Sequence, residues 1–188
     1  MPVNKDHGFT SIFILIYCLI ALTLPAEIFA GKPDSLLNIA TDNKVEIADR
    51  INAYADLVYH FEASDPDKAL GLGAEGLKIQ PTDSAYNALG VLNVNIGFVY
   101  KSIQEIDSSI VYFENAAEAF TKAGEQKNAA IQYKNIGVYY RKMGDYTTAI
   151  EYQIRSLKLF EEINDINGQV TATMNIGNVY IFQKQPEL

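Results

Sequence analysis

The clearest pattern of apolar positions lies between residues 127 and 163. From Lys127 to Met143, apolar and small residues recur at helical spacing and form one stripe of Ala130, Tyr133, Ile136, Gly137 and Tyr140. Gly144 ends this helix, and Asp145 caps a second helix that is predicted from Tyr146 to Ile163. The stripe of the second helix consists of Ala149, Tyr152, Ser156, Leu157 and Phe160. Neither helix can bury its stripe alone, so the pattern predicts a stacked helix pair.

This pattern recurs with a fixed period. The triplet Asn-Ile-Gly occurs three times at a spacing of 40 residues, and a tyrosine follows each glycine by three positions. Gly124 and Asn164 also share a phase, and both residue types readily take the left-handed conformation that ends a helix. The period predicts an all-α fold, an α-solenoid of antiparallel helix pairs. Its repeated positions are Ile96, Gly97, Tyr100, Ile136, Gly137, Tyr140, Ile176, Gly177 and Tyr180, together with Ala149.

The small residues of the repeat have a steric interpretation. A glycine inside a helix costs about 1 kcal/mol relative to alanine, so its recurrence at one phase indicates a packing constraint. Gly137 and Ala149 are therefore predicted to lie where two antiparallel helices approach closely, with Tyr140 filling the space one turn later. Asn135 is predicted either to bond to a neighbouring helix or to contact a ligand.

The array is predicted to cover residues 44–188, after a linker or short capping helix at 31–43. Its units are predicted at about 44–82, 83–124 and 125–164, followed by an incomplete unit at 165–188. The incomplete unit has one helix and no second helix to cover its apolar side chains. Three explanations stay open: the chain is a piece of a longer protein, the last helix is an imperfect cap, or it pairs two copies.

The first unit is degenerate. The pair Tyr54-Ala55 takes the place of Ile-Gly, and Asp65-Pro66 marks the start of the second helix through an N-cap carboxylate and a first-turn proline. Three small residues mark the inner face of that helix, namely Ala69, Gly73 and Gly76. Because its glycines make this helix weak, it is expected to rely on packing against Tyr54 and Tyr59.

The N-terminus carries a different signal. Residues 12–24 form an uncharged apolar run that fits the core of a secretory signal and is short for a membrane-spanning helix. Residues 1–30 are therefore predicted to be a signal peptide, with an uncleaved membrane anchor as the alternative. The protein is expected to be exported, either periplasmic or anchored and facing outside the cytoplasm. The single cysteine, Cys18, lies inside the run, so the mature chain would have no thiol chemistry.

Composition and charge narrow the function. The net charge is −8 and no basic run occurs, which argues against nucleic acid as a partner. After residue 30 the chain retains one histidine, His60, and no cysteine. No pattern of a catalytic triad, a metal site or a phosphate loop is present, so neither an enzyme activity nor a cofactor is expected.

The Ile-Gly-x-x-Tyr of the first helix, the alanine twelve residues after that glycine and the aromatic and small pattern of the second helix resemble the tetratricopeptide repeat family. The resemblance covers about 44–183 and is strongest over 91–160. The 40-residue unit is longer than the family's usual one and resembles the extended subclass common in bacterial signalling proteins. The family's proline near the end of the second helix is replaced by Glu161.

The resemblance implies a peptide-binding groove lined by the first helix of each pair. By phase, the candidate groove residues are Val94, Phe98, Lys101, Lys134, Val138, Arg141, Met174, Asn178 and Ile181. Lys134 and Arg141 could grip an acidic or C-terminal carboxylate, or they could be solvated surface charges. Val138 stands where the family's carboxylate clamp needs a polar residue.

Two functions follow as expectations. The first is an exported, non-catalytic module that binds a protein or peptide, with possible membrane association through residues 12–24 and a possible homodimer through the C-terminal helix. The second is the extracytoplasmic sensor region of a membrane signalling protein whose histidine kinase, cyclase or DNA-binding output domain lies elsewhere.

Overall fold

The computed structural model describes residues 27–184, and the apolar run at 12–24 lies outside them. Every regular element in the described part is helical, which confirms the prediction of an all-α solenoid. The helices are α2 (Glu27–Thr41), α3 (Ile47–Phe61), α4 (Pro66–Leu77), the 3-10 turn η1 (Asp83–Ala85), α5 (Tyr86–Ser102), α6 (Ile106–Lys122), α7 (Gln126–Lys142), α8 (Tyr146–Glu162) and α9 (Ile166–Gln183). No helix among them is long and apolar enough to cross a membrane.

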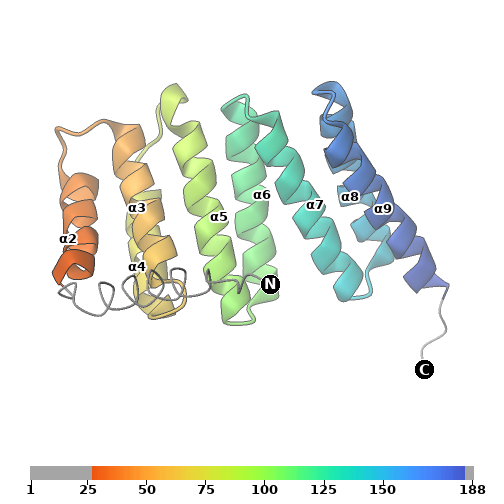
Figure 1. Ribbon diagram of the computed structural model, residues 1–188, viewed down its shortest axis with the longest axis horizontal. Helices are drawn as coiled ribbons and strands as arrows, with labels where there is room; N and C mark the ends of the chain where they lie inside the picture. Colours follow the sequence, from red (N-terminus) through yellow and green to blue (C-terminus); the bar gives the residue numbers. More distant parts are fainter. Residues whose placement is uncertain (1–26, 185–188) are drawn as a thin grey trace, which may run out of the picture. The chain divides into compact units, whose positions relative to one another are not determined.

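From Leu36 onward the helices form one compact unit with two layers (Figure 1). The helices α3, α5, α7 and α9 form one layer, and α4, α6 and α8 lie behind them. Consecutive helices pack in pairs, and each pair also packs on the next: α3 packs on α5, α6 on α7 and α8 on α9. We call α3, α5, α7 and α9 the A helices, and α4, α6 and α8 the B helices.

Local chemistry sets the ends of these helices. Gly124 and Asn164 have φ values of 75° and 56°, so both end a helix in the left-handed conformation, as predicted. The side chains of Asp65, Asp145 and Asp165 each accept a backbone N–H three residues later and cap the helix that follows. Pro66 occupies the first turn of α4, as expected from its fixed φ.

The repeated glycines of α5 and α7 lie at close contacts between helices. A Cβ added to Gly137 would lie 3.0 Å from the backbone oxygen of Ala149, which confirms the predicted approach of α7 to α8. A Cβ on Gly97 would lie 2.9 Å from the ring of Phe113 in α6. Gly177 in α9 has no such neighbour within 4 Å, because no described helix follows α9.

The first helix pair differs from the prediction in one detail. Gly73 of α4 approaches Ile96 of α5, and a Cβ at Gly73 would lie 2.7 Å from it, whereas Val58 of α3 would lie at an ordinary contact distance of 3.4 Å. The close contact between α3 and α4 is that of Gly76 with Tyr54, where an added Cβ would lie 2.8 Å from the tyrosine Cβ, so small residues line the B helix as predicted. Tyr54 packs against Gly76 as expected, but Tyr59 is 70% exposed and does not support α4.

Side-chain amides connect successive helices. Asn95 donates from Nδ2 to the backbone oxygen of Ala55 at 2.9 Å, and Asn175 donates to Gln153 Oε1 at 3.2 Å. Gln153 is buried and in turn donates from Nε2 to the backbone oxygen of Lys134 at 2.8 Å. One glutamine of α8 thus ties α7 to α9. Asn135 makes no corresponding side-chain bond among the described residues.

The last helix leaves an apolar face uncovered. None of the residues from Ile166 to Gln183 is an acid or a base. Its six exposed large apolar side chains are Ile166, Val170, Met174, Tyr180, Ile181 and Phe182. Tyr180 and Gly177, which keep the phase of the repeat, therefore lack the packing that Tyr140 and Gly137 have.

Candidate functional site

Two adjoining hollows lie along the A helices, and we call them together the A groove. The first, the apolar hollow, encloses about 320 Å³ between α5 and α7. The second, the polar hollow, encloses about 220 Å³ between α7 and α9. Ile131 lines both, so the two hollows are neighbours along the array.

The apolar hollow contains two of the predicted groove residues, Val94 and Phe98. Phe98 is held edge-on against the buried ring of Phe113, with 5.3 Å between ring centroids. The ammonium of Lys101 lies 5.4 Å from the centroid of Phe98 and borders this region. The remaining lining residues are Val91, Phe120, Asn128, Ile131, Gln132 and Asn135.

The polar hollow contains the predicted Lys134 and an ion pair that the sequence did not reveal. Lys127 Nζ lies 2.8 Å from Asp165 Oδ2, so the pair joins the start of α7 to the start of α9. The bond from Lys127 and the backbone N–H of Gly168 lower the pKa of Asp165 below its ordinary value. Asp165 therefore both caps α9 and lines the polar hollow.

The lowered pKa of Asp165 predicts a pH effect on stability. A carboxylate whose pKa is lower in the folded state stabilises the fold at neutral pH, and this contribution is lost as the pH falls through about 4 and below. We expect Asp165→Asn to be less stable than the wild type at pH 7 and closer to it at pH 3. Urea unfolding at both pH values measures the difference, and a gap that is the same at both would contradict the assignment.

The other predicted groove residues have different surroundings. The guanidinium carbon of Arg141 lies 4.8 Å from the ring centroid of Phe182 in α9, and so Arg141 does not line the hollow that holds Lys134. Val138 is half-buried, whereas Met174, Asn178 and Ile181 are exposed on α9. The structure therefore brings together Val94, Phe98 and Lys134, and leaves the other six residues outside the two hollows.

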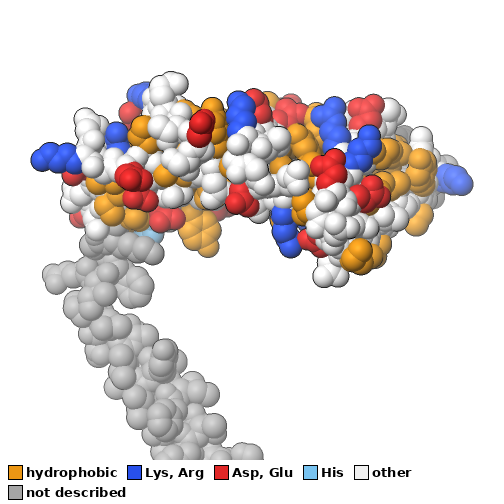
Figure 2. Space-filling view, turned by 90° about the horizontal axis from the view of Figure 1, so that it is seen from above, with side chains coloured by type: hydrophobic (Ala, Val, Ile, Leu, Met, Phe, Trp, Pro, Cys, Tyr) orange, Lys and Arg blue, Asp and Glu red, His pale blue; other side chains and the backbone are white. Residues whose placement is uncertain are grey.

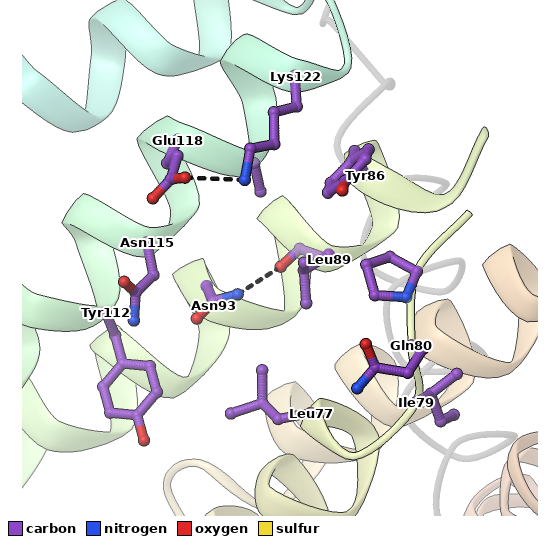
Figure 3. A pocket seen from close by; sticks show the side chains of 12 residues that line it. Leu77, Ile79, Gln80, Tyr86, Leu89, Asn93, Tyr112, Asn115, Glu118 and Lys122 are labelled. Atoms are coloured by element: carbon purple, nitrogen blue, oxygen red, sulfur yellow. Dashed lines mark hydrogen bonds and ion pairs between the residues drawn. The ribbon is translucent and has the colours of Figure 1, made fainter. Parts of the chain in front are cut away.

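A third hollow, of about 410 Å³, lies toward the B helices (Figure 3). Tyr86 of α5 and Tyr112 of α6 border it, and burial, together with the neighbouring Tyr100, raises the pKa of Tyr112. A surface pair, Lys122 Nζ and Glu118 Oε1 at 2.8 Å, stands at its rim. Sequence reasoning missed this hollow, because its walls come from α4, α5, α6 and the segment before η1 and share no repeated pattern.

The hollows offer aromatic, aliphatic, amide and a few charged groups, which suits the binding of a polypeptide. In the space-filling view, acidic and basic side chains are interspersed along the array rather than gathered in one basic patch (Figure 2). No cluster of histidine, cysteine, aspartate or glutamate that could hold a metal ion occurs in the part of the chain that the structure describes.

Comparison with known proteins identifies the repeat. The crystal structure of BtubC (BKLC) from P. vanneervenii superposes with a TM-score of 0.64 at 19% identity, over 80% of this chain and 63% of that one. This likeness concerns the fold, and the chain spans less than two thirds of the length of that neighbour. No curated protein matches the sequence.

The family model for the tetratricopeptide repeat matches residues 87–162 and 127–188, which together are more than half of the chain. Repeats of this family are generally non-catalytic scaffolds for protein interaction. The two layers of helix pairs and the close contacts at Gly97 and Gly137 agree with this match. The chain therefore belongs to the tetratricopeptide repeat family.

Proposed function

We propose that this protein is an exported interaction module that holds a peptide segment of another protein in the A groove. The observation that carries the proposal is that the apolar and polar hollows lie side by side along the A helices and share Ile131. An extended ligand is suited to two small neighbouring hollows, whereas a compact metabolite would occupy only one. Family membership supports the same class of partner.

Export is part of the proposal and is supported by the apolar run at 12–24 and the small residues that follow it. The intact mass of the native protein from its source cells tests it. A mass below the 20.9 kDa of the full sequence, by the amount of residues 1–30, is expected. A mass equal to the full sequence would favour the uncleaved anchor.

A second candidate function is favoured by the apolar face of α9. That face is what a further helix of a longer array would cover, as in the sensor region of a membrane signalling protein, and a second copy of the chain could cover it too. A mass far above 20.9 kDa under denaturing conditions would favour the sensor. A dimer of the short chain would show twice its mass under native conditions and the mass of one chain under denaturing conditions.

Matched tyrosine substitutions test which face binds. Asn135 lines the apolar hollow on α7, and Asn115 lines the hollow of Figure 3 on α6. Peptides selected from a display library against the full chain are expected to lose about tenfold or more in affinity for Asn135→Tyr, because the ring fills the groove. They should bind Asn115→Tyr within about twofold of wild type. The opposite ranking would move the binding site to the B helices and contradict the proposal.

A further inference from the structure

The helix pairs α5/α6 and α7/α8 share one aromatic contact. Tyr100 of α5 stacks on Tyr112 of α6 with 5.2 Å between ring centroids, and Tyr140 of α7 stacks on Tyr152 of α8 at 5.5 Å. The interplanar angles are only 14° and 8°, so the rings lie face to face in both pairs. The tyrosine that follows the repeated glycine is therefore paired, in each case, with a tyrosine of the next B helix.

Both sides of this contact have the same short sequence pattern. On the A helix the tyrosine follows a glycine by three positions, and on the B helix it follows a serine or an alanine by three positions. The small residues are Gly97 and Ser109 in the first of these pairs and Gly137 and Ala149 in the second. A small residue lets the two helices approach closely, and the tyrosine one turn later reaches across to the other helix. The contact thus joins two helices that carry equivalent residues.

Helix α9 has the same pattern, and no described helix covers it (Figure 1). Gly177 and Tyr180 keep the spacing, an added Cβ at Gly177 would meet no atom within 4 Å, and Tyr180 is 50% exposed. Helical spacing places Val170, Met174 and Ile181 on the same side, and each of them is more than half exposed. We call these five residues the α9 seam.

Charge and pattern together favour a second copy of this chain as the occupant of the α9 seam. The net charge of −8 makes two copies repel each other unless they meet through a neutral surface. No acid or base occurs between Ile166 and Gln183, so two α9 helices bring no like charges together. Each α9 also supplies the small residue and the tyrosine that the contact requires from both sides.

We propose that two copies of this chain associate through the α9 seam, with the two α9 helices antiparallel about a two-fold axis. Gly177 then faces the partner's Gly177 at the crossing, and Tyr180 stacks on the partner's Tyr180, as Tyr140 stacks on Tyr152 within the chain. Met174 and Ile181, which were predicted to line a peptide groove, lie in this contact instead. None of the five residues lines either hollow of the A groove, so the inference goes beyond the proposed function.

The size of the α9 seam sets the expected affinity. Five side chains from each copy bury roughly 1,000 Å² in total, which is the low end for a specific interface. We therefore expect a monomer–dimer equilibrium with a Kd of about 1–100 µM. Sedimentation equilibrium of the full chain over a range of concentrations measures it.

A charge exchange at Tyr180 tests the two-fold contact. Tyr180→Lys and Tyr180→Glu each place like charges against each other across the axis, so each variant alone should dimerise at least about tenfold more weakly than the wild type. An equimolar mixture of the two should associate about fivefold or more tightly than either alone, because opposite charges then meet. Val111→Lys, at an exposed position of α6, is the matched control and should dimerise within about twofold of the wild type. Circular dichroism should show wild-type helicity for all three.

Three results would overturn the inference. The first is a wild-type chain that stays monomeric at all concentrations. The second is a dimer that persists in both Tyr180 variants, since it would form through another surface, such as the apolar run at 12–24 that all variants share. The third is a mixture that associates no better than the single variants, which would exclude a contact of Tyr180 with its own copy. Library peptides should still bind Tyr180→Lys, so failure of the dimer leaves the A groove standing.

Discussion

Replacing Gly137 with leucine is expected to unfold the array or destabilise it by about 3–5 kcal/mol. A Cβ at Gly137 would lie 3.0 Å from the backbone oxygen of Ala149 and 2.5 Å from Gln153 Nε2. The backbone of α8 cannot move aside as a side chain could. Displacing Gln153 would also break its bonds to Lys134 and Asn175, which join α7 to α9. Total stability of a domain is about 5–15 kcal/mol, so this loss is large.

The chain supplies its own control for this substitution. Gly177 belongs to the same Asn-Ile-Gly triplet and phase, but a Cβ there would meet no atom within 4 Å. Gly177→Leu is expected to keep full helicity, and Gly177→Ala should raise stability by up to about 1 kcal/mol, because alanine favours a helix. Thermal melts by circular dichroism compare the variants. If Gly137→Leu melted like Gly177→Leu, the close contact between α7 and α8 would not exist in solution.

These two glycines also show how much of the fold can be predicted from the sequence. The period of 40 residues, the stripe of each helix, Gly144 and the capping residue Asp145 predicted α7 and α8 to within one residue at each end. Such features are local or periodic, and so they can be read along one chain. The Asn-Ile-Gly triplet alone does not distinguish Gly177 from Gly137; the difference follows from the second helix, which the unit predicted at 165–188 lacks.

The first helix pair was harder to predict for a physical reason. A close contact requires one small partner, but either helix can supply it. In α5 and α6 the glycine is Gly97 and the large partner is Phe113, whereas in α3 and α4 the glycine is Gly76 of the second helix and the large partner is Tyr54. A search for Ile-Gly at the phase of α5 therefore found only Tyr54-Ala55, because the glycine of this contact lies on α4.

The A groove was predicted in part. Helical phase placed Val94, Phe98 and Lys134 on the exposed side of the A helices, where the structure has the two hollows. Phase alone does not tell which partner a long side chain chooses, and Arg141 lies on Phe182. The unpaired oxygen of Gln132 depends on amide orientation and on burial, which no sequence pattern reports.

The second large effect is expected for Phe113→Ala, which should cost about 3–5 kcal/mol. Phe113 is fully buried in α6 and joins three helices. Its ring lies edge-on to Phe98 of α5 and stacks on Tyr139 of α7, with 5.9 Å between the latter centroids. Val111→Ala on the exposed side of the same helix should change stability by only about 0.5 kcal/mol. Urea unfolding of both variants measures the contrast.

A second substitution should recover part of that loss. The three atoms nearest to a Cβ on Gly97 all belong to the ring of Phe113, so Phe113→Ala removes the whole obstacle. Gly97→Val alone should be destabilising, but in the Phe113→Ala background its side chain can enter the space that the ring leaves. We expect a favourable coupling of about 1 kcal/mol or more between the two substitutions. The first helix pair already has this arrangement, with Tyr54 on the A helix against Gly76 on the B helix. Strictly additive losses would instead mean that the two positions do not share one space. An exchange of the glycine and the large residue between the A and B helices would then not explain how the first two helix pairs adopt the same fold.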